Sequence, residues 1–307
     1  MTCYHPLKGY RSKTLTATGK RGFVVDRKLA LLDCPMQIPC GQCIGCRLER
    51  SRQWAVRISH EASLYDQNCF ITLTYSPEFL PSDGSLNVRH FQLFLKRLRK
   101  KYGKNIRFFH CGEYGDNLGR PHYHATLLNF DFPDKKLHRK SDRGDHIYRS
   151  ASLEELWPFG LSEIGAVTFE SAAYVARYCL KKKTGKLAAD HYTRLDPSSG
   201  EIFELKPEYT TMSRKPGIGA PWLQKFSTDV YPHDAVVIRG GMKVPPPRYY
   251  NKQYEVLYPD KYREIRRKRL VNSRALIKSN PLEYDYERLT VKETVKSMTV
   301  NSTLKRK

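Results

Sequence analysis

Two apolar runs separated by turn-forming residues constrain the fold of this chain more than any other feature of its sequence. The first run covers residues 106–111 and the second begins at His122, and the intervening GEYGDNLGR is rich in Gly, Asp and Asn. This pattern predicts a β-hairpin with a fairly long loop. Because successive side chains of a strand alternate between its two faces, His122 and His124 share one face and Tyr123 takes the other.

The segments around this hairpin alternate between strand and helix patterns. Residues 69–75, CFITLTY, alternate apolar and hydroxyl side chains, which is typical of a strand. Residues 85–105 have an apolar helical face, a basic one and Gly103 just past the end, and residues 171–183 have good helix propensity. We therefore predict an α+β fold in which helices flank a central, mainly antiparallel sheet.

The N-terminal segment has a different composition. Residues 1–46 are rich in Cys, Pro, Gly and Lys and show little periodicity, which predicts a loop-rich segment. Over residues 43–65 the apolar positions recur every three or four residues, which predicts an amphipathic helix. We place Arg57 among the arginines on the flanks of that helix.

A cysteine cluster stands where this segment enters the helix. Cys40, Cys43 and Cys46 follow one another at intervals of three residues, a spacing that three unrelated buried thiols rarely have. They could hold a structural Zn²⁺ with a fourth ligand, for which we favour Cys3 over Cys34 or His5. An iron–sulfur cluster and a compact loop of reduced thiols are the alternatives.

Regularity fades after residue 185. The stretch to about residue 258 is rich in Pro, Gly and Tyr, a basic helix is expected over 260–279, and a polar tail follows. Residues 131–150 are polar and are expected to be an excursion from the core. We predict three parts: the Cys-rich segment with its basic helix over 1–65, a core over 66–185, and a basic extension over 186–307 with a partly flexible tail.

The charge of the chain indicates an anionic partner. Its 54 Lys and Arg residues against 31 Asp and Glu give a formal net charge of +23, spread over every third of the sequence. A field of that size attracts polyanions, and nucleic acid is the commonest of them. The N-terminus has no apolar core of a secretory signal, and no apolar run is long enough to span a bilayer. We therefore expect a cytoplasmic protein without a membrane partner.

The two histidines gain a third candidate ligand from the preceding strand. Glu113 lies near the end of that strand, so the hairpin could bring its carboxylate beside His122 and His124. Two imidazoles and one carboxylate suit Mn²⁺ or Mg²⁺ better than structural zinc. Structural histidines at a strand end are the alternative interpretation.

A pair of tyrosines on the predicted helix could supply a nucleophile. Tyr174 and Tyr178 are four residues apart and therefore neighbours on one helical face, which Lys181 continues, while the apolar residues gather on the opposite side. An activated phenol can attack a DNA phosphodiester and keep the 5′ phosphate as a covalent ester. A second tyrosine within reach could cut a regenerated junction and allow a circle to close.

The order of these motifs resembles that of a known enzyme family. FITLTY, then GEYG…GRPHYHATL, then YVARYCLKK resemble the strand, His-hydrophobe-His and tyrosine motifs of the HUH endonucleases that initiate rolling-circle replication. The double tyrosine with a following lysine resembles their two-tyrosine branch. With PCGQCIGCR and SRKPGIGAPW added, the whole chain is similar to the replication initiation proteins of gokushoviruses, a group of Microviridae.

The resemblance implies a rolling-circle initiator fold, strand-specific nicking at a phage origin with strand transfer, and roles for the matching positions. Partners would be single-stranded and origin DNA together with the helicase and polymerase of the bacterial host, and the location would be the host cytoplasm. Thr72 and Thr74 belong to the strand motif, whose role is mainly structural, and Lys181 or Lys182 matches the family lysine near the scissile phosphate. By this resemblance the metal ligands are His122, His124 and Glu113, and the catalytic residues are Tyr174, Tyr178 and Lys181.

Two other functions fit parts of the sequence. A zinc-containing nucleic-acid-binding regulator would use the histidines structurally, and a metal-dependent phosphoesterase would use water as its nucleophile. Neither of them predicts a covalent protein–DNA product. The sequence has no G-x-x-x-x-G-K-[ST] motif, because Gly185 and Lys186 are followed by Leu. We therefore expect no helicase motor in this chain.

Overall fold

A computed structural model describes residues 3–115, 119–141, 144–178, 187–195 and 200–305. Backbone contacts divide the chain into two compact units, one of Ser51–Tyr262 and one that joins Met1–Arg50 to Arg263–Lys307. The three-part division at residues 65 and 185 stays a prediction. We describe each compact unit by itself.

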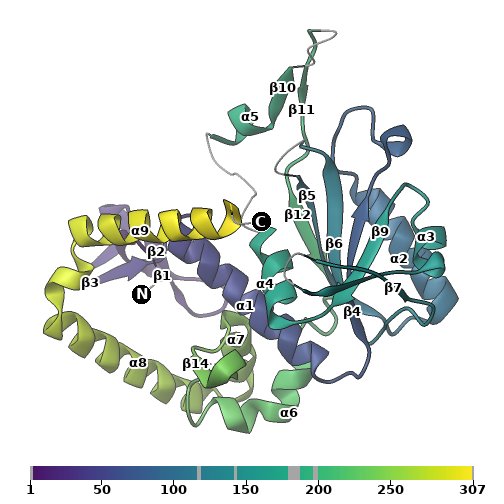
Figure 1. Ribbon diagram of the computed structural model, residues 1–307. Helices are drawn as coiled ribbons and strands as arrows, with labels where there is room; N and C mark the ends of the chain where they lie inside the picture. Colours follow the sequence, from purple (N-terminus) through teal and green to yellow (C-terminus); the bar gives the residue numbers. More distant parts are fainter. Residues whose placement is uncertain (1–2, 116–118, 142–143, 179–186, 196–199, 306–307) are drawn as a thin grey trace. The chain divides into compact units, whose positions relative to one another are not determined.

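The larger unit is built on a seven-stranded antiparallel sheet with the strand order β12-β5-β6-β4-β9-β8-β7 (Figure 1). The predicted hairpin is confirmed as its β5–β6 pair, and the predicted strand after residue 68 is β4. The predicted α+β class with a mainly antiparallel sheet is therefore confirmed. The strands are β4 (Asn68–Thr74), β5 (Arg107–Tyr114), β6 (Pro121–Leu128), β7 (Lys136–Lys140), β8 (His146–Arg149), β9 (Ser162–Ala166) and β12 (Tyr209–Met212).

Helices cover both faces of this sheet (Figure 1). Helices α2 (Val88–Tyr102) and α3 (Ala151–Leu156) pack on the face that carries Ile71, Leu73 and Tyr123. On the other face, Phe109, Cys111 and Leu128 pack against α1 (Ile44–Ala62) and α4 (Phe169–Tyr178). Because strand side chains alternate between faces, the even-numbered residues of β6 point to the α1 and α4 side.

Helix α2 is the clearest case of a helix that its own sequence specifies. The Asn87 side chain accepts a hydrogen bond from the Arg89 amide at the N-terminus, and Gly103 ends the helix with φ at 101°. Its apolar stripe is buried, and its last turn carries three basic residues at the negative end of the helix dipole. The predicted helix over this stretch is confirmed.

Arg57 lies differently from the position predicted for it. It is buried, with its guanidinium 3.9 Å from the ring centroids of both Trp54 and Tyr249, and its Nε donates to the carbonyl of Ile218 at 2.8 Å. Burial lowers the pKa of Arg57 to about 10. The expectation of a solvated flank was wrong because two aromatic rings, one of them far along the chain, enclose the planar cation.

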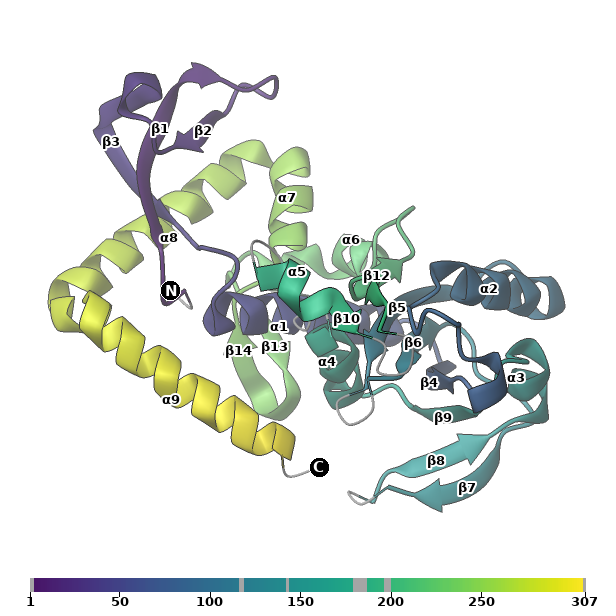
Figure 2. The ribbon, with the colours of Figure 1, turned by 90° about the horizontal axis from the view of Figure 1, so that it is seen from above.

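The second unit contains a sheet that the sequence pattern did not indicate. Three antiparallel strands in the order β2-β1-β3 replace the loop-rich segment expected over residues 1–46 (Figure 2). Most of their side chains are exposed, so no apolar alternation marks them. These strands are β1 (Leu7–Leu15), β2 (Arg21–Val24) and β3 (Ala30–Ile38).

Helices complete this unit at the other end of the chain. The predicted basic helix is confirmed as α8 (Pro259–Ser279), and the expected polar tail contains a further helix, α9 (Tyr286–Lys305). The polar stretch 131–150 likewise forms the β7–β8 hairpin rather than an excursion. No helix in the described ranges is long and apolar enough to cross a membrane.

The remaining elements lie between α4 and α8, apart from the short 3-10 helices. They are α5 (Leu187–Tyr192), β10 (Thr193–Leu195), β11 (Ile202–Glu204), α6 (Ala220–Val230), β13 (Val236–Ile238), β14 (Met242–Val244) and α7 (Arg248–Leu257). The 3-10 helices are Arg27–Leu29, Pro77–Phe79, Arg239–Gly241 and Pro281–Tyr284.

Candidate active site

The register of the central hairpin brings the three candidate metal ligands together. Glu113 is the direct cross-strand partner of His122, and His124 is the partner of Cys111. Oε1 of Glu113 lies 2.7 Å from Nε2 of His122 and 3.1 Å from Nε2 of His124. One carboxylate oxygen therefore faces both imidazoles from the neighbouring strand.

The far side of each imidazole is also held. Nδ1 of His122 lies 3.2 Å from the carbonyl oxygen of Arg120, and Nδ1 of His124 lies 3.0 Å from Oγ1 of Thr72 on β4. A carbonyl oxygen only accepts hydrogen bonds, so Nδ1 of His122 carries the hydrogen in that contact. The Nε2 atom of each ring is thus directed toward Glu113. Such outer contacts are characteristic of metal-ligating histidines.

The charge of Glu113 is maintained although its side chain is buried. Burial raises the pKa of this carboxyl, but the hydrogen bonds from His122 and His124 outweigh that effect and bring the pKa to about 2. The group therefore stays a carboxylate at neutral pH. A buried carboxylate between two imidazoles is a strong local negative site in a chain of large positive charge.

These three residues fit a divalent cation. Their ligand atoms all lie within 4.8 Å of one another, and their nitrogen and oxygen donors suit borderline and hard metal ions. The fit rests on the donor chemistry and on the contacts that fix both rings. The three residues are Glu113, His122 and His124.

Helix α4 brings a tyrosine to the same place. Its Ala172, Val175 and Ala176 are fully buried against the sheet, as the sequence predicts for the apolar side, whereas Tyr174 is half-buried. The Tyr174 ring meets the His124 ring edge-on, with centroids 5.3 Å apart at 81°, and Phe70 packs against both. The first predicted nucleophile therefore lies beside a predicted metal ligand.

The other two predicted catalytic residues are placed less fully. Tyr178 is the last residue of α4, one turn after Tyr174. Lys181 and Lys182 lie outside the described residues, as does Cys179, which the sequence predicts for the apolar side of the helix.

Tyr123 points away from the site, and its hydroxyl joins a buried network. The hydroxyl lies 2.8 Å from that of Tyr75, donates to the carbonyl of Asn87 at 3.0 Å and accepts from the Asn87 amide at 2.9 Å. Tyr75 in turn contacts Nδ1 of His90 at 2.7 Å. The residue between the two histidines thus ties β6 to the start of α2. The sequence pattern did not indicate these partners.

The predicted cysteine ligands also converge, in the smaller unit. Cys3 joins the three closely spaced cysteines, and the four sulfurs lie within 4.8 Å of one another. Cys34 and His5, the other candidates for the fourth ligand, are not part of this group; Nε2 of His5 instead pairs with Glu293. The described residues thus contain two groups that could hold a metal ion. They are Cys3, Cys40, Cys43 and Cys46, and Glu113, His122 and His124.

An antiparallel α+β unit with a carboxylate, two imidazoles and a neighbouring tyrosine defines a protein with a candidate divalent-metal site. Comparison with known proteins adds the family. The family model of the replication-associated protein ORF2 matches residues 68–183, a range that runs from β4 past α4. The chain belongs to the replication-associated proteins of Microviridae phages.

Individual relatives support this membership. The chain is 34% identical over 284 residues to the replication-associated protein VP4 of Bdellovibrio phage phiMH2K, which covers 90% of this chain and 84% of that protein. It is 33% identical over 237 residues to the replication-associated protein ORF2 of Spiroplasma virus 4, covering 73% and 70% of the two chains. A shorter match of 37% over 155 residues links it to the replication-associated protein ORF4 of Chlamydia phage 1, covering 47% and 38%. No solved structure matches the chain significantly.

Proposed function

We propose that this protein initiates rolling-circle replication of a phage genome by nicking one DNA strand at the origin with a tyrosine nucleophile. The observation that carries the proposal is the position of the Tyr174 ring, 5.3 Å from the ring of His124, beside the group formed by Glu113, His122 and His124. The names of the relatives, all replication-associated proteins of phages, agree with a role in DNA replication.

The residues divide the work between binding and bond exchange. Oη of Tyr174 forms a bond to the phosphorus, the bond from phosphorus to the 3′ oxygen breaks, and the phenolic proton is passed on to leave a free 3′-OH. The 5′ phosphate stays on the tyrosine as an ester. Glu113, His122 and His124 would hold Mn²⁺ or Mg²⁺, which when bound polarises the phosphoryl oxygens and offsets the charge that develops on them.

A second tyrosine suits the later steps of such a reaction. The free 3′-OH primes synthesis, and Tyr178 then cuts the regenerated junction in the same way. The new 3′-OH attacks the first phosphotyrosine and releases its phenol, so that one phosphodiester bond replaces one ester and the circle closes. Lys181, or Lys182 beside it, would contact the scissile phosphate.

The substrate follows from the charge and from the family. A net charge of +23 favours nucleic acid, and contacts from lysines and arginines to phosphates give affinity with little sequence selectivity. We propose single-stranded and origin DNA as the substrate, in the cytoplasm of the bacterial host. The sequence lacks a phosphate-binding loop of the NTPase type, so strand separation and synthesis are assigned to the helicase and polymerase of the host.

Formation of a covalent adduct tests the proposal. Wild-type protein is incubated with Mn²⁺ and labelled single-stranded DNA that carries the phage origin, and the products are separated on a denaturing gel. We expect a protein–DNA adduct that resists denaturation and is lost in the Tyr174→Phe/Tyr178→Phe double variant. Tyr148→Phe, in the edge strand β8, is the matched control and should form the adduct normally.

Two other outcomes would replace the proposal. Nicking without any adduct would favour a metal-dependent phosphoesterase that uses water. Binding of the DNA without cleavage in Mn²⁺ or Mg²⁺ would favour a zinc-containing regulator of replication. An adduct that persists in the double variant would show that another residue is the nucleophile.

A further inference from the structure

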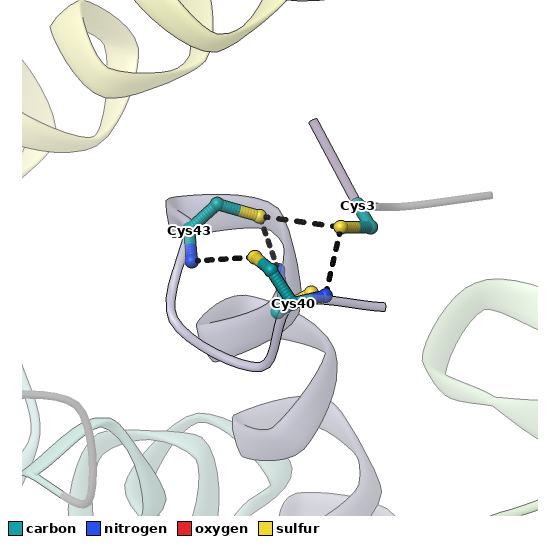
Figure 3. Close-up of side chains that lie close together, drawn as sticks. Cys3, Cys40 and Cys43 are labelled. Carbon is teal, nitrogen blue, oxygen red and sulfur yellow. Dashed lines mark hydrogen bonds between the residues drawn. The ribbon is translucent and has the colours of Figure 1, made fainter. Parts of the chain in front are cut away.

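The two ends of the chain meet in the smaller unit at a group of four thiols. We call Cys3, Cys40, Cys43 and Cys46 the cysteine cluster. Cys3 comes from the N-terminal arm, Cys40 and Cys43 from the turn after β3, and Cys46 from the first turn of α1, and all but Cys40 are buried. Figure 3 shows Cys3, Cys40 and Cys43 with their sulfur atoms turned toward one another.

Backbone amides surround these sulfurs. The amide of Cys40 donates to Sγ of Cys3 at 3.2 Å, and the amide of Cys43 donates to Sγ of Cys40 at 3.3 Å. Sγ of Cys43 accepts from the amides of Tyr4 at 3.4 Å and Cys46 at 3.5 Å. Amide hydrogens directed at sulfur stabilise negative charge on it, and thiolate is the form that binds metal.

The spacing of the sulfurs matches one metal ion. Four sulfurs about 2.3 Å from one zinc ion at the corners of a tetrahedron lie about 3.8 Å from one another. Sγ of Cys43 is 4.0 Å from Sγ of Cys3, and all four sulfurs lie within 4.8 Å of one another. An iron–sulfur cluster distributes its cysteines over several irons and so holds their sulfurs further apart. The geometry therefore favours a single tetrahedral ion.

The C-terminal helix makes direct contact with the residues around this cluster. Oε1 of Glu293, on α9, accepts a hydrogen bond from the amide of Ile44, the first residue of α1, at 3.4 Å. Oε2 of the same carboxylate pairs with Nε2 of His5, two residues after Cys3. A carboxylate at the positive end of a helix dipole is favourable, so Glu293 both caps α1 and holds the N-terminal arm.

A pocket beside the cluster is lined by both ends of the chain. Cys3, Pro6 and Gln37 contribute from the N-terminal part, and Ile277, Leu282 and Leu289 contribute from α8, the following turn and α9. The half-buried residues of α9 include Leu289, Glu293, Ser297 and Val300, which recur at helical spacing and therefore form one face.

We propose that the cysteine cluster binds one structural zinc ion and that this ion fastens α9 to the N-terminal arm. Zinc binding replaces the thiol protons, which pass to solvent, and involves no change of oxidation state. The arm is short and joins the cluster only through Cys3, so loss of the ion releases Tyr4 and His5 together with the partner of Glu293. The C-terminal helix then loses its main polar contact with the rest of the unit.

Metal analysis tests the site itself. We expect purified wild-type protein to contain close to one zinc ion per chain that persists in the His122→Ala/His124→Ala variant, which separates it from the candidate active site. Cys43→Ser should lose the ion, whereas Cys34→Ser, a cysteine of the same segment outside the cluster, should keep it. Replacement by Co²⁺ should give the intense sulfur-to-metal absorption of a tetrahedral thiolate site. Absence of zinc and of this Co²⁺ spectrum, or a disulfide found by thiol counting, would overturn the proposal.

Hydrogen exchange tests the link to α9. Comparing the zinc-loaded wild type with chelator-treated protein supplied with Mn²⁺, we expect faster exchange in the amides of α9 and β1 and unchanged exchange in β4, β5 and β6. Thiolate sites select zinc strongly over Mn²⁺, so the added Mn²⁺ serves only the other site. Glu293→Gln should keep the zinc and show the faster exchange in α9 alone. Equal protection of α9 with and without zinc would show that the ion does not fasten the helix.

Discussion

Glu113 and His122 stand directly opposite each other on β5 and β6, with Oε1 and Nε2 2.7 Å apart. Because the backbone ladder of the hairpin fixes this pairing, the two ligands are brought together by the fold of the sheet before any cation binds. A preformed ligand pair needs little reorganisation on binding. The site can therefore be altered chemically with little change in its shape.

Glu113→Gln tests the charge of this site. The amide keeps the shape of the side chain and removes the anionic ligand, so we expect the rate of DNA cleavage in Mn²⁺ to fall by about a hundredfold or more, equivalent to several kcal/mol of transition-state stabilisation. Single-turnover cleavage of labelled origin DNA measures the rate. His138→Ala, in the exposed edge strand β7, is the control and should cleave normally. An undiminished rate in Glu113→Gln would remove Glu113 from the ligand set.

Thr72→Val tests whether β4 orients the second imidazole. Valine has nearly the same shape as threonine but cannot bond Nδ1 of His124, which lies 3.0 Å from the Thr72 hydroxyl. Loss of such an outer contact typically lowers metal affinity by about 10–100-fold. Titration calorimetry with Mn²⁺ measures the change, and Thr72→Ser, which retains a hydroxyl, should stay close to wild type. Equal affinities for the valine and serine variants would contradict the role of Thr72.

The sequence predicted the centre of the fold well because its signals there are local. The strand β4, the helix α2 and the β5–β6 hairpin each have a period, a cap or a turn that lies within a few residues. The position of Glu113 beside the histidines followed from the hairpin alone. Tyr174 could be placed near them only through the order of the motifs, since its contact with His124 spans fifty residues of chain.

The features missed by the sequence analysis depend on long-range contacts or on weak patterning. The strands β1, β2 and β3 have mostly exposed side chains, and β3 contains Pro35, so they lack the alternation that identifies a half-buried strand. Every residue of β7 is exposed, so it has no apolar face. Arg57 could not be recognised as buried, because one of the two rings that enclose it is Tyr249. These enclosures become visible only when distant segments pack together.

Tyr123→Phe tests the buried hydroxyl network behind the site. Removing this hydroxyl leaves the amide and carbonyl of Asn87 without the bonds of 2.9 and 3.0 Å that Tyr123 makes with them. Leaving buried polar groups unsatisfied costs about 1–3 kcal/mol of the free energy of unfolding. Urea denaturation measures the loss, with Tyr148→Phe in β8 as the control for removal of a tyrosine hydroxyl. An equal, small effect of both substitutions would show that the network contributes little.

The pH dependence of stability tests the burial of His60 in the larger unit. Its ring stacks on Trp222 with centroids 3.6 Å apart, Nδ1 lies 3.1 Å from the Tyr250 hydroxyl, and burial lowers the pKa of His60 to about 4. The unfolded chain, with a pKa near 6.5, binds more protons between these values, so the free energy of unfolding should rise with pH from about 4 to 6.5. The rise from this one group is up to about 3 kcal/mol, is complete above pH 6.5, and is lost as the pH falls toward 4.

His60→Phe removes the titrating group while keeping an aromatic ring for the stack on Trp222. The variant should therefore show a shallower rise of unfolding free energy over this pH range than the wild type, and the difference between the two proteins should be greatest in slope rather than in absolute stability at pH 7. His138→Phe, on the exposed strand β7, should keep the wild-type slope. Urea denaturation followed at closely spaced pH values measures all three proteins. A His60→Phe curve parallel to that of the wild type would mean that the protonated imidazole is tolerated in the folded unit, and that the stack on Trp222 opens to water on the acid side.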